Sequence, residues 1–211
     1  MILSSVDKGL MSMIRCAVRG LCYENQFDNS IDWNSLFALA NQQAISVLIA
    51  DGLQVYLSAY PKDKPFANES VTDKQNRMRW LGQVMAYERL YARHEKGMAD
   101  LAQLYACNGI RMMVLKGYGL SLDWPVPNHR PVGDLDIYNF GKWKEADALV
   151  AKECGIKVDE GHEHHTIFNF NGVSVENHYD FINTKAHRDA PKIETQLKML
   201  AERESREIEV Q

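Results

Sequence analysis

Apolar residues in the first half of the chain recur every three to four positions, as they do on one face of a helix. This spacing predicts helices over residues 6–23, 32–39, 44–60 and 72–108. Asp32 is the expected N-cap of the second helix, and Ser30 is a competing cap. Asn108 and Gly109 are expected to end the longest helix. Residues 61–70, rich in Pro, Lys and Asp, are expected to form a surface loop.

From residue 110 onward the pattern changes to short apolar or alternating runs, which are typical of strands. Strands are expected over residues 110–115, 134–138, 156–158, 166–170 and 173–178, and helices over 119–123, 142–154 and 190–206. Three prolines make residues 124–131 a loop. Asn171-Gly172 predicts a two-residue hairpin turn, because both positions of such a turn need positive φ. The order of elements predicts a helical N-terminal region, 1–108, followed by a mixed region, 109–211, in a chain of the α+β or α/β class.

Composition excludes several classes of protein. Charged residues make up 25% of the chain and its net charge is -4, so a nucleic-acid-coating role is not expected. The four cysteines contain no Cys-x-x-Cys pair and indicate reduced thiols rather than a zinc ribbon or a disulfide framework. Charged residues interrupt the first 20 positions, so neither a signal peptide nor a membrane span is expected. A cytoplasmic protein without a membrane partner is the expectation.

The strand predicted over residues 134–138 carries two acidic residues at alternate positions. Asp134 and Asp136 therefore project from one face, while Leu135 and Ile137 face the core. Two parallel carboxylates repel one another unless a cation lies between them, and oxygen ligands suit Mg²⁺. Gly133, directly before the pair, would let the backbone approach a ligand closely.

The predicted hairpin supplies a third carboxylate by its register. If the Asn-Gly pair forms the turn, Ile167 lies opposite Glu176, and His165 lies opposite His178. Glu176, His178 and His165 then share one face of the sheet. The pattern therefore offers a carboxylate and two imidazoles on a single surface.

The histidine-rich run before this hairpin also invites a zinc interpretation. His162 and His164 have a spacing that can place two imidazoles on one face of a strand. No matching Cys or Asp pair completes a tetrahedral set, so zinc is not the prediction. Contact with phosphate or substrate is the functional hypothesis for His165 and His178, and packing is the alternative.

Three segments together resemble a known family. They are residues 115–117 (Leu-Lys-Gly), 130–137 (Arg-Pro-Val-Gly-Asp-Leu-Asp-Ile) and 175–178 (Val-Glu-Asn-His). They are similar to motifs of the uncharacterised bacterial nucleotidyltransferase family, within the DNA polymerase beta-type nucleotidyltransferase superfamily. The resemblance covers roughly residues 110–181. It implies an α+β nucleotidyltransferase fold, with a small mixed sheet flanked by helices.

The resemblance also implies an activity and roles for individual residues. The activity is transfer of a nucleoside monophosphate from an NTP such as ATP to an unidentified hydroxyl acceptor, with pyrophosphate leaving. Asp134, Asp136 and Glu176 would bind Mg²⁺, or Mn²⁺ in its place, and carry catalysis. The phosphate ligands that it implies are Lys116, Gly117 and Arg130. Gly133, His165 and His178 complete the predicted nucleotide and phosphate site, from the backbone approach and the hairpin register described above.

One departure from the superfamily pattern keeps other functions open. Tyr118 follows Gly117, where Ser or Gly is usual, so the hydroxyl that would contact phosphate is missing unless Ser121 replaces it. One alternative is a catalytically degenerate nucleotide-binding module with a regulatory or interaction role. Another is a metal-dependent phosphotransferase or phosphohydrolase. The presence of all three carboxylates favours the transferase.

Overall fold

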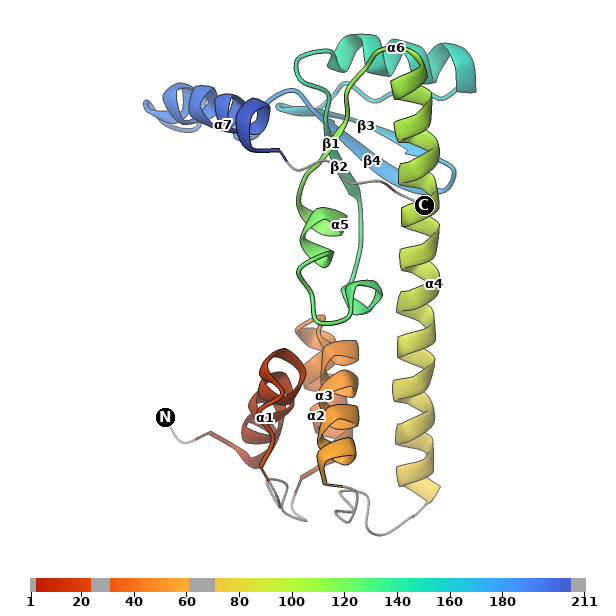
Figure 1. Cartoon of the computed structure of the whole chain (residues 1–211), viewed down its shortest axis with the longest axis vertical. Helices are drawn as coiled ribbons and strands as arrows, with labels where there is room; N and C mark the ends of the chain where they lie inside the picture. The colour runs from red at the N-terminus through yellow and green to blue at the C-terminus, as the bar shows by residue number, and fades with distance from the viewer. Residues whose placement is uncertain (1–2, 24–30, 61–70, 206–211) are drawn as a thin grey trace. The chain divides into compact units, whose positions relative to one another are not determined.

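The computed structural model describes residues 3–23, 31–60 and 71–205 (Figure 1). The chain divides into two compact units, Met1–Tyr91 with Asp123–Pro131, and Ala92–Leu122 with Val132–Gln211. The long helix α4 (Val71–Cys107) contributes residues to both units. The division into a helical region, 1–108, and a core, 109–211, stays a prediction.

The first unit contains the helices expected from the apolar spacing. They are α1 (Ser5–Arg19), α2 (Trp33–Gln42), α3 (Ser46–Ala59) and the first part of α4. The predicted cap Asp32 is confirmed, since its side chain accepts a hydrogen bond from the backbone N–H of Asn34. Helix α1 ends earlier than expected, because Gly20 adopts the left-handed conformation with φ of 62°. The competing cap Ser30 and the loop over 61–70 lie outside the described residues.

The proline-rich segment 123–131 is anchored within the first unit by a half-buried histidine. His129 ends the short 3-10 turn η1 (Pro127–His129) that interrupts the expected loop. Its Nδ1 lies 2.8 Å from Asp51 Oδ1, and its Nε2 lies 3.3 Å from Glu88 Oε1. The imidazole therefore provides a partner for one oxygen of Asp51, a carboxylate buried on α3.

The second unit is built on a four-stranded mixed sheet in the order β1-β2-β4-β3. Strand β1 (Met113–Val114) pairs antiparallel with β2 (Leu135–Tyr138), β2 pairs parallel with β4 (Val173–His178), and β4 pairs antiparallel with β3 (His165–Phe170). The helices of this unit are the end of α4, α5 (Lys116–Ser121), α6 (Trp143–Cys154) and α7 (Ala190–Glu204). The predicted α+β class with a small mixed sheet is confirmed.

The register of the β3–β4 hairpin is the predicted one. Ile167 pairs with Glu176, and His165 pairs with His178. The turn residues Asn171 and Gly172 have φ values of 52° and 80°, as the two-residue turn requires. The alternation of side chains along β4 therefore follows from the position of the turn.

The two faces of the sheet have different neighbours. On one face, α4 approaches so closely that a Cβ on Gly97 would lie 2.9 Å from Val173 Cγ2. On the same face, Asp147 of α6 accepts hydrogen bonds from Asn177 Nδ2 (2.8 Å) and Thr166 Oγ1 (2.9 Å). These helices cover the apolar side chains of the core. The opposite face carries the acidic and imidazole side chains.

Several expected elements differ from the structure. The strand expected over 110–115 is reduced to β1. No strand forms over 156–158, and the next residue, Asp159, makes an isolated bridge to Ile167. Helix α5 begins at Lys116, three residues earlier than the expected 119, and it includes Gly117, whose φ of 30° and ψ of -106° are not helical. Short apolar runs become strands only where a neighbouring strand accepts their hydrogen bonds.

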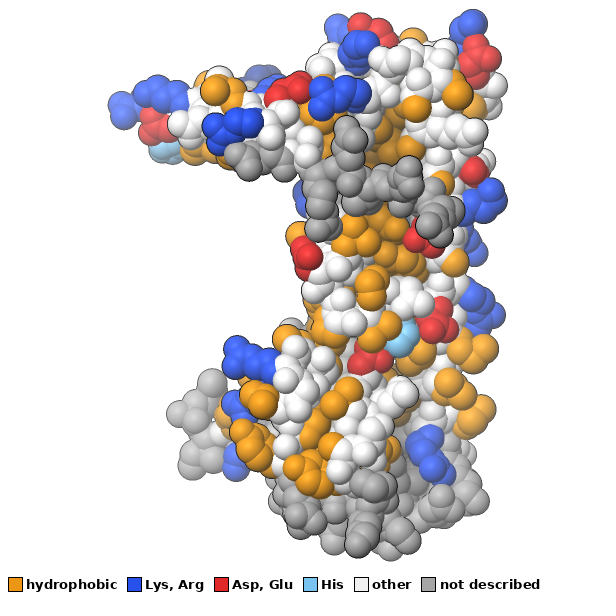
Figure 2. Space-filling model, viewed as in Figure 1, with side chains coloured by type: hydrophobic (Ala, Val, Ile, Leu, Met, Phe, Trp, Pro, Cys, Tyr) orange, Lys and Arg blue, Asp and Glu red, His pale blue; other side chains and the backbone are white. Residues whose placement is uncertain are grey.

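The last helix, α7, exposes charged and apolar side chains together. Figure 2 shows Lys, Arg, Asp and Glu side chains interspersed with apolar ones along it. Ile193, Met199 and Leu200 are its exposed large apolar residues. Among the described residues, no helix combines the length and apolar character needed to cross a membrane.

The facing of β2 gives a test of the sheet. Leu135 is 2% exposed on the covered face, so Leu135→Asp would bury an unpaired charge. We expect the free energy of unfolding to fall by more than about 3 kcal/mol in urea titrations. Ser174→Asp, at an exposed position of β4, is the control and should stay close to the parent protein. Equal stability of the two variants would contradict the assigned facing.

Candidate functional site

Three carboxylates meet where β2 and β4 run parallel. Asp136 and Glu176 are direct partners across the two strands and therefore lie on the same face. Asp134 precedes β2 and is exposed, and its carboxyl is close enough to that of Glu176 to raise the pKa of Glu176. The three predicted acidic residues are thus brought together from segments 40 positions apart, since Asp136 pairs with Glu176.

Asp136 is the buried member of this group, and two cations or donors hold it. Lys116 Nζ lies 2.8 Å from its Oδ1, and His178 Nε2 lies 2.9 Å from the same oxygen. Burial disfavours its charge, yet the bonds from His178 and Lys116 outweigh burial and lower the pKa of Asp136 to about 2. Asp136 is therefore ionised at neutral pH.

Glu176 responds to the same surroundings in the opposite direction. Burial and then the neighbouring carboxyl of Asp134 raise the pKa of Glu176, and the charge of Asp136 adds to the effect. His178 Nε2, 3.4 Å from Glu176 Oε2, offsets part of this repulsion. A divalent cation among these oxygens would relieve the remainder, so the donor set fits a hard metal ion.

The turn after β1 places Lys116 against the acidic group. Leu115 N–H donates to the carbonyl of Asp136 across the sheet (2.9 Å). Lys116 and Gly117 then have φ values of 25° and 30°, a conformation that non-glycine residues seldom adopt. The hydrogen bond to Asp136 raises the pKa of Lys116. The side chain of Lys116 is 63% exposed, so its ammonium group can reach a ligand from solvent.

The hydroxyl groups of Tyr118 and Ser121 both donate hydrogen bonds to other groups of the protein. Tyr118 is buried, and its hydroxyl donates to Glu95 Oε1 (2.8 Å) on α4. The Ser121 hydroxyl is fully buried and donates to the carbonyl of Tyr118 (2.6 Å). In this structure the Ser121 hydroxyl is therefore engaged with the backbone, and its replacement of the missing phosphate-binding hydroxyl stays an open alternative.

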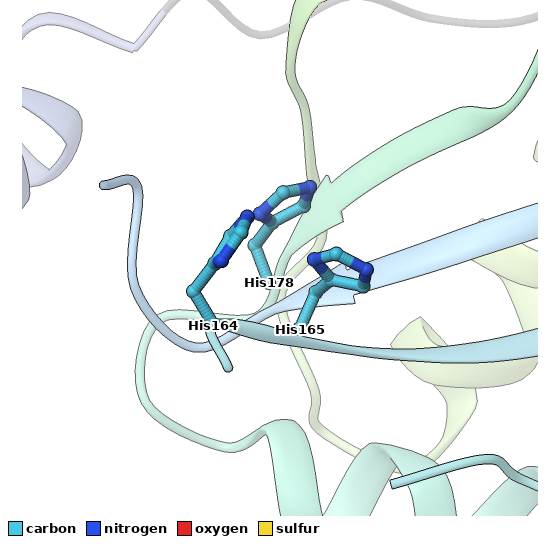
Figure 3. A group of neighbouring side chains, drawn as sticks. All are labelled: His164, His165 and His178. Carbon is cyan, nitrogen blue, oxygen red and sulfur yellow. The ribbon is translucent and has the colours of Figure 1, made fainter. Parts of the chain in front are cut away.

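Histidines close one end of the acidic group. Figure 3 shows His164, His165 and His178 gathered at the start of β3 and the end of β4. His165 Nε2 lies 3.9 Å from Glu176 Oε1. Burial, followed by repulsion from His164, His178 and His162, lowers the pKa of His165 to about 4. This ring is neutral at pH 7 and brings no positive charge to a phosphate.

Sequence reasoning missed His164. The hairpin register selected His165 because neighbouring residues of a strand normally face opposite ways. His164 lies just before β3, where alternation no longer applies, and its ring packs against His165 with a centroid distance of 4.6 Å. The signal available in the sequence was the adjacent pair of histidines itself.

The surroundings of two further predicted phosphate ligands, Gly133 and Arg130, are described by their packing and hydrogen bonds. A Cβ added to Gly133 would meet no atom within 4 Å, so this glycine is not required by packing. Arg130 belongs to the first compact unit, and its Nη1 donates to the carbonyl of Pro131 (3.1 Å). The roles of Gly133, Arg130 and Gly117 in phosphate binding stay predictions, as does phosphate contact by His165 and His178.

The small mixed sheet with helices on one face and carboxylates on the other is consistent with the nucleotidyltransferase fold. Comparison with known families agrees. The model of the family described as uncharacterised nucleotidyltransferase matches residues 29–211. The chain therefore belongs to this nucleotidyltransferase family. No curated protein and no solved structure matches the chain.

The lowered pKa of Asp136 predicts a pH-dependent contribution to stability. The carboxylate favours the folded state above its usual pKa of 3.8, and this contribution disappears as the pH falls through about 2. In metal-free buffer at pH 7, the free energy of unfolding of Asp136→Asn should be about 2 kcal/mol lower than that of the parent. Urea titrations should show that this difference in the free energy of unfolding between parent and variant becomes smaller between pH 4 and pH 2. Asp123→Asn, an exposed carboxylate, is the control. A gap that does not change with pH would show that Asp136 is not held as described.

Proposed function

We propose that this protein transfers a nucleoside monophosphate from an NTP to a hydroxyl acceptor, with Mg²⁺ or Mn²⁺ as cofactor. The observation that carries the proposal is the parallel pairing of Asp136 with Glu176 beside Asp134. A carboxylate triad of this kind supplies the oxygen ligands that divalent ions use in phosphoryl and nucleotidyl transfer. Membership of a nucleotidyltransferase family supports the same reaction class.

Asp134 and Asp136 are the proposed ligands of the ions that accompany the triphosphate. When bound, two such ions stabilise the attacking and leaving oxygens of an in-line displacement. Asp136 is buried and ionised, so its oxygens are fixed in direction before substrate arrives. Asp134 is exposed, so its carboxylate is accessible to an ion from the solvent.

Glu176 is the proposed residue that orients and deprotonates the acceptor hydroxyl, or binds the second ion. Its raised pKa, caused by burial and by Asp134, makes the carboxylate a stronger base than an exposed glutamate. The proton of the hydroxyl passes to a carboxylate oxygen as the hydroxyl oxygen attacks the α-phosphorus, and pyrophosphate leaves.

Lys116 is the proposed cation for the triphosphate. Its ammonium group is bonded to Asp136, and its side chain is largely exposed, so it can turn toward phosphate oxygens once a metal ion binds the carboxylate. Gly117 and the amides that follow it are proposed as further phosphate contacts on the family resemblance.

A catalytically inactive nucleotide-binding module is the second candidate. The observation that favours it is the engagement of Tyr118 and Ser121 in buried hydrogen bonds, which leaves neither hydroxyl for the phosphates. The intact carboxylate triad favours the enzyme. A phosphohydrolase is distinguished by its product, since hydrolysis releases inorganic phosphate and transfer releases pyrophosphate.

Nucleotide binding should depend on the acidic group. We expect at least one of the four NTPs to raise the melting temperature of the protein only when Mg²⁺ is present. The double variant Asp134→Asn with Asp136→Asn should lose this shift while keeping its circular dichroism spectrum. An undiminished Mg²⁺-dependent shift in the double variant would remove the proposed metal site.

Catalysis should depend on Glu176 more than binding does. With the NTP found above and a panel of hydroxyl acceptors, Glu176→Gln should reduce pyrophosphate release by a factor of about 100 or more, as expected when a general base is removed. Glu160→Gln, an exposed glutamate outside the acidic group, should retain activity. Binding without pyrophosphate release in the parent, across all acceptors, would favour the inactive module.

A further inference from the structure

The three histidines beside the acidic group form a cluster of their own. One nitrogen from each of His164, His165 and His178 lies within 4.8 Å of the nitrogens from the other two. Their ring centroids are 4.6, 5.1 and 5.6 Å apart, and Figure 3 shows the rings turned toward one another. Three imidazoles so close together offer a set of nitrogen ligands, whereas the neighbouring carboxylates offer only oxygen ligands.

The bond between His178 and Asp136 determines which nitrogen of His178 can bind a ligand. Asp136 is ionised and can only accept, so His178 Nε2 carries the proton of this 2.9 Å hydrogen bond. In the neutral ring, Nδ1 then carries the lone pair. A carboxylate that holds the far nitrogen of a histidine is the usual outer partner of a metal-ligating imidazole.

The free nitrogens of the cluster are buried. The Nδ1 atoms of His164, His165 and His178 are all inaccessible to solvent and, within the described part of the chain, have no hydrogen-bond partner. The side chain of His178 is only 2% exposed. An unsatisfied buried polar atom costs free energy, and three in one cluster point to a shared ligand that accepts their lone pairs.

We propose that His164, His165 and His178 bind one borderline divalent transition-metal ion of the Zn²⁺ class, at a site separate from the Mg²⁺ site on the carboxylates. Imidazole nitrogen selects such ions over Mg²⁺, which prefers oxygen. With Zn–N distances of about 2.0–2.1 Å, tetrahedral ligands lie about 3.3 Å apart, so modest side-chain rotation closes the set. Three protein ligands leave a fourth position for water or a substrate oxygen.

The backbone holds the ligands in place. The carbonyl of His164 accepts hydrogen bonds from the N–H groups of Tyr179 (3.1 Å) and Asp180 (3.3 Å), directly after β4. His165 and His178 are partners in the antiparallel ladder. The start of β3 is thereby tied to the end of β4, and the ion would add a further link between them. Through His178 it would also orient Asp136.

This assignment reverses the expectation drawn from the sequence. Zinc was set aside there because no Cys or Asp pair accompanied the histidine run. The third ligand is His178, which lies 13 residues beyond its ladder partner His165 and reaches the cluster through the hairpin. A second group, Asp136 with Glu176 and His178, could also hold an ion, and the experiment must separate the two.

Calorimetric titration of Zn²⁺ into the full chain, without a histidine tag and after EDTA treatment, tests the proposal in the absence of nucleotide. We expect one ion per chain, and Co²⁺ should give the visible absorption of a tetrahedral site with nitrogen ligands. His164→Ala should weaken Zn²⁺ binding at least about 100-fold, because even the loss of an outer partner costs about 10–100-fold. Millimolar Mg²⁺ should not displace the ion.

Two variants provide the controls. His162→Ala removes a ring that stacks on His165 but lies outside the cluster, and it should bind Zn²⁺ as the parent does. Glu176→Gln should also retain binding, since it leaves all three imidazoles. Absence of binding in the parent, or equal binding in His164→Ala, would overturn the proposal. So would loss of binding in Glu176→Gln alone, which would assign the ion to the carboxylates. Circular dichroism confirms that each variant is folded, and the Co²⁺ spectrum of the parent needs no variant.

Discussion

The parallel pairing of β2 with β4 is the constraint on which the rest of the site depends. It pairs Asp136 with Glu176 and Tyr138 with His178, so the position of each side chain along β2 is fixed relative to β4. A shift by one residue would turn the acidic side chains into the apolar core and bring Leu135 and Ile137 to the surface. The cost of exposing these buried aliphatic residues therefore holds the carboxylates in place.

The same pairing brings negative charges close together, and each carboxylate is affected by different neighbours. Asp136 takes its two partners, Lys116 and His178, on a single oxygen. Burial, followed by the neighbouring carboxyl of Asp134, raises the pKa of Glu176. Adjacent carboxylates in one site thus have opposite electrostatic character, which is the arrangement that separates a fixed ligand from a group that can exchange a proton.

Asp136 links the two clusters. One of its oxygens accepts from His178, which is also a member of the imidazole cluster with the half-buried His164 and His165. The acidic group and the imidazole cluster are therefore coupled through one ring, although their ligand chemistry differs. A change in the charge of either cluster would be felt by the other across this single hydrogen bond.

Local sequence was sufficient for the features that depend on neighbours in the chain. The helices of the first unit followed from apolar spacing, and the cap at Asp32 followed from its side-chain oxygen. The hairpin register followed from Asn171-Gly172, because a two-residue turn leaves only one way to count back along the strands. The shared face of Glu176, His165 and His178 was therefore predictable without coordinates.

Only the tertiary structure decided which strands became neighbours and what the side chains met there. The pairing of β2 with β4 joins distant segments, so nothing in either segment specifies it. The buried bonds of Ser121 and Tyr118 depend on how the turn after β1 packs. His164 joined the cluster because the backbone just before β3 escapes strand alternation and is bonded to the end of β4. Sequence periodicity determines the face on which a residue lies within an element, whereas contacts between elements depend on packing that no local pattern encodes.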